Sequence, residues 1–293
     1  MIKIRILNMG SINIDYVYSV PHFVQAGETL SASQRQIFPG GKGMNQSIAL
    51  ARAGGNVTHA GMIGRDGVHL LETLKDAGVD VGLIKEVDEP TGHAIIQVTP
   101  KGENCILLFA GANLKLDENF VDKALESFGK GDILVLQNEV SCVPYAIKAA
   151  KDKGMSVAFN PSPFEDKIEN YPLNLIDLWL LNEIEGQALT QKNNPSDMLA
   201  EMGHLYPGAT TVLTLGEDGV MCFTNGKLFT RDSCKVNVVD TTAAGDTFTG
   251  YFISSIAKGK EISEALQIAS KAASISVSRQ GAATSIPLLD EVI

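Results

Sequence analysis

The residues of this chain that are best placed to do chemistry lie between Val238 and Phe248, in the sequence VVDTTAAGDTF. The apolar, β-branched start of this stretch predicts the end of a strand, and the apolar spacing that follows predicts a helix. The small residues Ala243, Ala244 and Gly245 connect the two. A helix that begins at small residues leaves backbone N–H groups available, and these donors and the helix dipole together favour an anion.

A carboxylate lies beside this predicted anion site, because Asp246 falls in the first turn of the helix. It could accept a proton from a hydroxyl group while the N–H groups hold negative charge on the group under attack. This combination suits the transfer of a phosphoryl group to an alcohol. On this stretch alone a structural interpretation stays open, in which Asp246 favours the positive helix end and Gly245 allows close packing.

A second glycine-rich stretch, PGGKGMNQ at residues 39–46, leads into another predicted helix. It does not match the GxxxxGK[ST] phosphate loop, because no Ser or Thr stands at the required place. Its glycines still allow a ligand to approach the backbone closely. We therefore predict that Gly41, Lys42 and Asn45 contact a ligand.

Asn13 and Asp15 lie two residues apart in a segment that is predicted to be extended. Residues at this spacing face the same side of a strand, so an amide and a carboxylate are presented together. Such a pair suits the neighbouring hydroxyl groups of a sugar. The alternative is a loop with solvated polar side chains.

The elements that must position these residues form two patterns. From about residue 117 helices and strands alternate, which predicts a parallel sheet with helices on both faces. The helices are expected at 117–128 and, capped by Ser141, up to residue 153, and the strands at 133–136, 156–159, 178–181 and 211–215. Ligands bind outside the carboxyl ends of such strands. Four polar or small residues stand at these ends: Glu139, Asn182, Thr214 and Gly216.

The first part of the chain differs, because several predicted strands there have no helices between them. Short apolar runs at 16–18 and 36–38, and a pair of strands at 91–99 and 104–110 with a hairpin at Lys101–Gly102, predict a separate small β layer. Other predicted elements are a first strand at 1–7, a strand at 57–64, a helix at 68–77 and a last long helix at 262–279.

Composition limits the classes of function. The chain has 293 residues, of which 44% are hydrophobic and 20% charged, which suits one large globular domain or a domain with an appendage. The net charge of -10 disfavours nucleic acid and a basic membrane-binding surface, but not a nucleotide. The sequence has no CxxC or HExxH motif, so nothing in it indicates a zinc site. The four cysteines suggest a reducing compartment. Without a signal peptide or membrane span, we expect a cytoplasmic protein.

Together, the motifs at 40–46 (GGKGMNQ) and 240–248 (DTTAAGDTF, the DTxAAGD pattern) resemble those of the ribokinase-like, or PfkB-type, carbohydrate kinases, and the resemblance covers nearly the whole chain. Segments 10–15, 27–29, 111–113 and 279–287 are most similar to the ribokinase branch. The resemblance implies an α/β fold, with a Rossmann-like, mostly parallel sheet, helices on both faces and a small β-sheet lid. It implies one kinase domain over 1–293, with the discontinuous lid at about 12–40 and 91–110.

The resemblance also implies roles for individual residues. It places Asp246 as the base, and the backbone N–H groups of Ala243, Ala244 and Gly245 as the anion hole. The sugar would be held by Asn13, Asp15, Gly41, Lys42, Asn45 and Glu139. Asn182 and Glu185 match an NxxE pattern that is linked to Mg²⁺ and phosphate. The nucleotide would contact Thr214, Gly216, Gly219 and Ser270, and a monovalent cation, usually K⁺, would be held by Asp240, Thr242, Ser276, Arg279, Gly281 and Ser285.

The implied reaction is ATP-dependent phosphorylation of D-ribose at O5, with ribose 5-phosphate and ADP as products, in a homodimer joined through its lids. Other acceptors, such as 2-deoxyribose, fructose or adenosine, and an inactive sugar-binding regulator are the alternatives. A dinucleotide-dependent oxidoreductase is disfavoured, because no GxGxxG follows the first strand. Met44 and Asn138 depart from the residues common in the family and could change the sugar preference.

Overall fold

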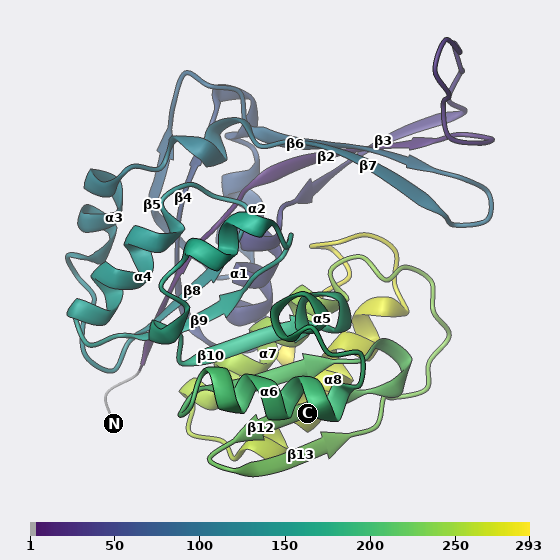
Figure 1. Ribbon diagram of the computed structural model, residues 1–293. Helices are drawn as coiled ribbons and strands as arrows, with labels where there is room; N and C mark the ends of the chain where they lie inside the picture. The colour runs from purple at the N-terminus through teal and green to yellow at the C-terminus, as the bar shows by residue number, and fades with distance from the viewer. Residues whose placement is uncertain (1–3) are drawn as a thin grey trace.

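The computed structural model describes residues 4–293, and their strands form a nine-stranded central sheet and a separate four-stranded sheet (Figure 1). The order of the central sheet is β13-β12-β11-β10-β9-β8-β1-β4-β5, parallel from β11 to β5, with β12 and β13 antiparallel. Its strands are β1 (Arg5–Met9), β4 (Asn56–Ile63), β5 (Asp80–Glu86), β8 (Ile133–Gln137), β9 (Ser156–Asn160), β10 (Leu178–Asn182), β11 (Thr210–Thr214), β12 (Val220–Thr224) and β13 (Lys227–Arg231). Positions 1–3 of the predicted first strand lie outside the described residues.

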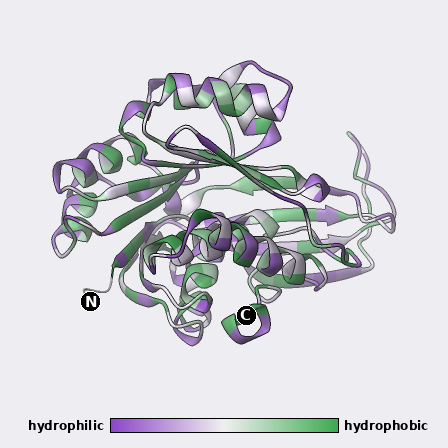
Figure 2. Ribbon diagram, turned by 90° about the horizontal axis from the view of Figure 1, so that it is seen from below, coloured by the Kyte–Doolittle hydropathy of each residue, from purple (hydrophilic) through white to green (hydrophobic). Residues whose placement is uncertain are grey.

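Helices cover both faces of this sheet, as expected, because its strands are apolar on both sides. In β8, for example, Val135 packs into one hydrophobic cluster, while Leu134 and Leu136 pack into the other. The first cluster lies under α1 (Lys42–Arg52), α2 (Leu70–Asp76), α7 (Ala244–Ala257) and α8 (Ile262–Val277). The second lies under α3 (Glu118–Leu125), α4 (Val143–Asp152), α5 (Glu183–Thr190) and α6 (Pro195–Leu205), and the short α9 (Leu289–Val292) ends the chain. In Figure 2 the central strands are mostly green and the helices alternate green and purple, as amphipathic helices do.

The four-stranded sheet, which we call the lid, extends from the body as an arm (Figure 1). Its order is β3-β2-β6-β7, with β2 and β6 parallel and the outer pairs antiparallel. The strands are β2 (Asn13–Ser19), β3 (Gln34–Gly40), β6 (Gly92–Val98) and β7 (Asn104–Phe109). The predicted hairpin at Lys101–Gly102 is confirmed, and Gly102 adopts the positive φ of 79° that its turn requires.

Three local expectations were wrong or incomplete. Val238 and Val239 form no strand but lie in a loop, 60% and 56% exposed. Ser141 does not cap α4, since its hydroxyl donates to the carbonyl of Leu116 instead. Strands β5, β12 and β13 were not predicted from the sequence. Across residues 4–293, none of the helices combines the length and apolar character needed to cross a bilayer.

Candidate active site

Within the described part of the chain, two cavities meet at the carboxyl edge of the central sheet. One, of about 490 Å³, lies between the lid and the body, and the other, of about 1180 Å³, lies over the end of β11 and the loop before α7. Both are lined by a shared set: Asn182, Thr214, Thr241, Ala244, Gly245 and Phe248. The N-terminus of α7 therefore stands where the contents of the two cavities would touch.

The start of α7 is shaped by an unusual backbone conformation. Ala243 precedes the helix with φ 61° and ψ 10°, a left-handed conformation that is uncommon for a residue with a Cβ. This turn lets the chain enter the helix abruptly from the loop, and the first N–H groups of a helix have no partner inside it. A methyl group added at Gly245 would meet no atom within 4 Å, so the space in front of the helix is open. The N–H of Ala244 donates to the carbonyl of Thr241 at 3.2 Å, and the open space in front of Gly245 leaves room for an anion.

Asp246 lies in the first turn of α7 and is buried, with 8% of its surface exposed. Both of its carboxylate oxygens accept hydrogen bonds from α1: Oδ2 from Asn45 Nδ2 at 3.1 Å and Oδ1 from Gln46 Nε2 at 2.9 Å. The carboxylate is thus held in one orientation at the wall of the smaller cavity. Gln46 had not been assigned a role from the sequence, although it directly follows Asn45 in the second glycine-rich motif.

The smaller cavity brings together all six residues that were predicted to hold the sugar: Asn13, Asp15, Gly41, Lys42, Asn45 and Glu139. Asn13 is fixed by Asn113, whose Nδ2 donates to Asn13 Oδ1 at 2.7 Å. Asn113 is itself oriented, since its Oδ1 accepts from the backbone N–H of Ile12 at 3.1 Å. Sequence reasoning gave Asn113 no such role, because 100 residues separate it from Asn13.

Asp15 lies on the cavity-facing side of β2, against the backbone of Gly40 on β3. A Cβ at Gly40 would come within 2.1 Å of the Asp15 carboxylate, so only glycine leaves room for it there. Burial, reinforced by the nearby charge of Glu139, raises the pKa of Asp15 to about 7. This sugar-facing carboxyl therefore gains or loses its proton close to neutral pH.

Glu139 follows β8 and is held by residues from other elements. Its Oε2 accepts from the hydroxyl of Ser11 and, at 3.0 Å, from the backbone N–H of Lys42. Burial raises the pKa of Glu139 above its ordinary value, although Lys42 opposes this effect. Burial disfavours the charge of Lys42, but Asp246, Glu139 and Glu185 outweigh it and raise the pKa of the ammonium group. The cavity thus contains carboxyl groups that accept hydrogen bonds from hydroxyl groups and an ammonium group that donates hydrogen bonds to them.

The larger cavity contains most of the residues that were predicted to bind the nucleotide: Asn182, Thr214, Gly216, Gly219, Gly245 and Ser270. Its wall is completed by Val236 and Val238, which explains why apolar residues occur in an exposed loop. Gly219 has φ 95°, and a Cβ there would lie 2.2 Å from the carbonyl oxygen of Arg231. The loop geometry at this position requires glycine.

Glu185 lines the smaller cavity, whereas Asn182 lines both. The two form a capping box at the start of α5, in which Asn182 Oδ1 accepts from Glu185 N and Glu185 Oε2 accepts from Asn182 N, each at 2.9 Å. Burial raises the pKa of Glu185. Because a carboxylate has about four acceptor positions, Glu185 keeps capacity for water on a divalent cation.

The residues that were predicted to hold a monovalent cation lie on the loop before α7, at the end of α8 and on the loop that follows α8. Asp240 accepts from the N–H groups of Thr242 at 2.9 Å and Gly281 at 3.0 Å. The hydroxyls of Ser276 and Ser285 are 2.8 Å apart. These contacts place a carboxylate and two hydroxyls, all of them oxygen ligands, on neighbouring segments of the chain.

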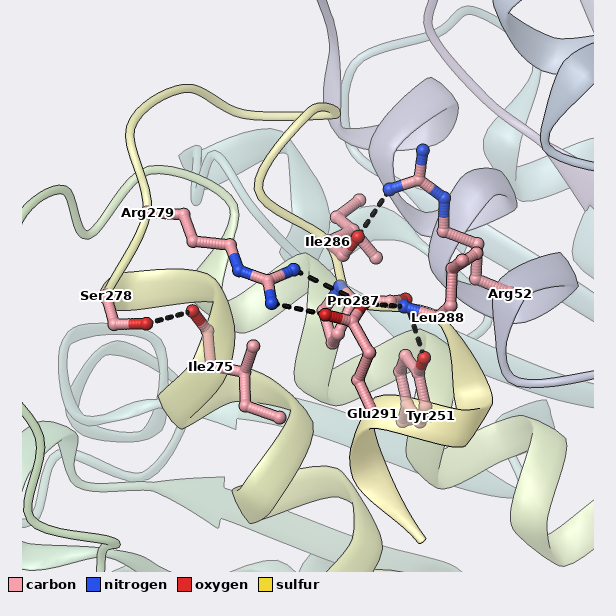
Figure 3. A network of polar contacts seen from close by, with 9 residues as sticks. All are labelled: Arg52, Tyr251, Ile275, Ser278, Arg279, Ile286, Pro287, Leu288 and Glu291. Atoms are coloured by element: carbon pink, nitrogen blue, oxygen red, sulfur yellow. Dashed lines mark hydrogen bonds and ion pairs between the residues drawn. The ribbon is translucent and has the colours of Figure 1, made fainter.

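The side chain of Arg279 points toward Glu291 (Figure 3). Its guanidinium pairs with Glu291, while Arg52 donates to the carbonyl of Ile286 and Tyr251 to that of Pro287 at 2.7 Å. The pairing with Arg279 lowers the pKa of Glu291 to about 2. These contacts fix the loop from its outer side, so Arg279 can serve a cation only through its main chain.

The two departures from the family pattern do not line the smaller cavity. Met44 is the third residue of α1 and is fully buried in the hydrophobic core. Asn138 donates to the carbonyl of Pro163 at 2.7 Å and accepts from Tyr171 at 2.9 Å, which fixes the loop that carries Ser162 and Pro163. Any effect of these residues on sugar preference would have to act through their neighbours.

Comparison with known proteins identifies the family. Residues 3–289 match the model for the pfkB family of carbohydrate kinases. A ribokinase of Haemophilus influenzae is 38% identical over 296 residues, which cover 97% of this chain and 96% of that protein.

Two solved structures are similar over nearly their whole length. The ribokinase of Cryptococcus neoformans var. grubii in complex with ADP has a TM-score of 0.88 and 34% identity, covering 99% of this chain and 98% of that one. The Arabidopsis thaliana ribokinase complexed with ribose and ATP has a TM-score of 0.87 and 31% identity, covering 100% and 98%. The chain belongs to the pfkB family of carbohydrate kinases.

Proposed function

We propose that this carbohydrate kinase transfers the γ-phosphoryl group of ATP to O5 of D-ribose and releases D-ribose 5-phosphate and ADP. The observation that carries the proposal is the position of Asp246, a fixed carboxylate beside a helix N-terminus where two cavities meet. Its relatives named as ribokinases, one of them complexed with ribose and ATP, support ribose as the acceptor and ATP as the donor.

In the proposed mechanism the smaller cavity binds the sugar. Asp15 and Glu139 accept hydrogen bonds from its hydroxyl groups, Lys42 and Asn13 complete the polar wall, and the backbone at Gly41 approaches the ring closely. Asn45 links this wall to the base through its bond to Asp246. The charged and amide groups suit a polyhydroxylated ligand, which favours a sugar over an apolar nucleoside base.

The chemical step takes place at α7. A free alcohol is not appreciably ionised at neutral pH, so Asp246 accepts the O5 proton as the oxygen forms its bond to the γ-phosphorus. The bond from that phosphorus to the β,γ-bridging oxygen breaks, and the electron pair leaves with ADP. The backbone N–H groups at the start of α7, chiefly that of Gly245, stabilise the charge on the transferred group, because the N–H of Ala244 already donates to the carbonyl of Thr241.

The larger cavity holds the nucleotide in this proposal, with Gly216, Gly219 and Ser270 around it and Thr214 near the phosphates. Asn182 and Glu185 fit Mg²⁺ bound through water, because Glu185 has acceptor positions beyond those in its capping box. A bound Mg²⁺ would neutralise the phosphate charge during transfer.

The proposed monovalent site is the group of oxygens around Asp240. Carbonyl, hydroxyl and carboxylate oxygens suit K⁺, so the donors present fit this ion. Asp240, Thr242, Ser276, Arg279, Gly281 and Ser285 would hold it, Arg279 and Gly281 through backbone carbonyls. Bound K⁺ would set the electrostatic environment of the loop that leads into α7.

We further propose that residues 1–293 act as one kinase domain, and that two copies dimerise through their lids. The side of the lid away from the sugar carries a row of aligned residues across its strands: Ile37, Tyr16, Ile95 and Leu107. Leu107 is 68% exposed in the single chain, and a second lid would cover it. Leu107→Asp should convert the dimer to monomers, as measured by light scattering. A wild-type enzyme that is monomeric at micromolar concentration would contradict the proposal.

The function is tested by measuring ADP release from Mg-ATP with ribose, 2-deoxyribose, fructose and adenosine, each with K⁺ and with Na⁺. We expect ribose to give the highest kcat/KM and K⁺ to increase it. Preference for another acceptor would overturn the assignment of ribose, and absence of turnover on all four would favour a sugar-binding regulator.

The cysteines are all free thiols, which is consistent with action in the reducing cytoplasm, where ATP is available.

A further inference from the structure

A chain of buried amide side chains runs from the central sheet to Asp246. Asn8 is on β1, Gln137 ends β8, and Gln46 is in the second turn of α1. All three are 0% exposed. Buried amides are costly unless they are hydrogen-bonded, so three in contact require a specific arrangement.

The bonds of this chain have a defined direction. Gln137 Nε2 donates both of its hydrogens, to Asn8 Oδ1 at 2.9 Å and to Gln46 Oε1 at 2.7 Å. Gln46 Nε2 then faces Asp246 Oδ1 at 2.9 Å, and its second hydrogen is directed at Asn160 Oδ1 at 3.3 Å. At the other end Asn8 Nδ2 donates to the carbonyl of Gly43 at 2.7 Å.

Both ends of the chain are groups that only accept, a backbone carbonyl and a carboxylate. If the amide of Gln137 were turned over, its oxygen would face the oxygens of Asn8 and Gln46, so these two acceptors fix its orientation. Gln137 Oε1 receives no hydrogen bond from the described residues, although its atoms are buried. A buried oxygen without a hydrogen bond destabilises the folded protein, and this one lies two hydrogen bonds away from the candidate base. Such destabilising features are expected at functional sites.

We propose that Gln46 and Gln137 are positioning residues, which hold the Asp246 carboxylate in the orientation needed to accept the substrate proton. This inference rests on the proposed function, in which Asp246 is the base. Gln46 acts directly on Oδ1, and Gln137 acts through Gln46 by presenting a donor to its oxygen, so that only the nitrogen of Gln46 can face Asp246. Neither residue lines the sugar cavity.

The test is a double-mutant cycle on the full-length enzyme with Gln46→Leu, Gln137→Met and the double variant. We expect Gln46→Leu to lower kcat by about 10- to 100-fold, the range for loss of one hydrogen bond to a charged group, and Gln137→Met to lower it by about 3- to 10-fold, because its bond to Gln46 joins two neutral amides. The KM values for ribose and ATP should change by less than about threefold. The double variant should be no slower than Gln46→Leu, because Gln137 acts only through Gln46.

Ser254→Ala is the matched control, since it removes a buried hydrogen bond between α7 and α1, to the carbonyl of Ala53, without touching the amide chain. Melting temperature and the dissociation constant for ADP are measured for every variant. If the Gln variants lose stability as Ser254→Ala does but keep wild-type kcat below their melting temperature, the positioning role is wrong. It is also wrong if the two losses of kcat multiply. Failure of the proposed function would appear differently, as a wild-type enzyme without ribose-dependent ADP release.

Discussion

The two cavities on either side of the α7 N-terminus are built in different ways. The polar part of the smaller cavity is formed by buried side chains that hydrogen bonds hold in place, such as Asn13 by Asn113 and Asp246 by Asn45, and the lid adds the apolar Ile106 and Leu108. The larger is lined by glycines and by exposed apolar side chains of loops, such as Val238. A rigid polar wall discriminates between sugars by the position of each hydroxyl, whereas a nucleotide can be held by backbone groups and apolar surface.

The first prediction distinguishes the role of Asp246 in turnover from nucleotide binding in the larger cavity. Asp246→Asn keeps the size of the side chain but removes the proton acceptor, so turnover should fall by about 10²- to 10⁴-fold. ADP should bind with nearly unchanged affinity by calorimetry, because the larger cavity is intact. Near-normal turnover in this variant would show that another group is the base.

The second prediction concerns the sugar side alone. Because the pKa of Asp15 is raised to about 7 by burial and the charge of Glu139, the ionised form that accepts hydrogen bonds is lost below that pH. The kcat/KM for ribose should then fall about tenfold per pH unit below pH 7. Asp15→Asn should bind ribose about 10- to 100-fold more weakly and lack this dependence. If kcat/KM for ribose in the variant still fell below pH 7 as it does in the wild type, the titrating group would be another residue.

The same group predicts how stability changes with pH. In the unfolded chain the carboxyl ionises near 3.8, whereas in the folded protein it keeps its proton up to about pH 7. The folded state therefore binds more protons in this window, and the contribution of Asp15 makes the free energy of unfolding fall as pH rises from about 4 to about 7. Chemical denaturation of ligand-free wild type and Asp15→Asn at several pH values should show a smaller fall in the variant.

The third prediction tests how closely the helices behind the base must pack. Gly250 lies one turn after Asp246 on α7, and a Cβ there would come within 2.4 Å of Ala49 Cβ on α1. Gly250→Ala should cost about 1–3 kcal/mol of stability and lower kcat by about tenfold, because α1 carries both amides that hold Asp246. Gly129→Ala is the control, since a Cβ at that position would have its nearest neighbour at 3.9 Å. Equal stability and kcat in both variants would contradict the packing argument.

The fourth and smallest effect is expected on the nucleotide side. Val238→Ala removes two methyl groups from the loop wall, which should raise the KM for ATP by about 3- to 10-fold. The KM for ribose and the kcat should stay at wild-type values in steady-state assays. A change in ribose KM as large as the change for ATP would mean that the two cavities are less independent than their construction indicates.

The sequence predicted the elements that have strong local patterns. The apolar strand at 133–136 and the glycine-bounded helix at 68–77 could be identified because periodicity and glycine determine them locally. β13 was not, because its mostly polar and exposed residues, KLFTR, dilute the apolar signal. Val238 and Val239 were misassigned since β-branched residues also occur where a loop offers an apolar surface to a cavity.

The candidate site could be anticipated only where a motif marked it. Asp246 and Asn45 were found because each lies in a glycine-rich motif at a helix start. Asn8 and Gln137 could not be, since each lies in a mostly apolar strand without a motif around it, and their contact depends on β1 and β8 being neighbours in the sheet. Pairing between strands that are more than 100 residues apart leaves no local trace in the sequence.

The chain of amides has a consequence for how the enzyme would respond to its surroundings. Asn8, Gln137 and Gln46 carry no group that gains or loses a proton at the pH of a cell. Asp15, which lines the sugar cavity, gains or loses a proton close to neutral pH. Mild acidification would therefore weaken the binding of ribose, while the hydrogen bonds among the three amides behind the base stay unchanged.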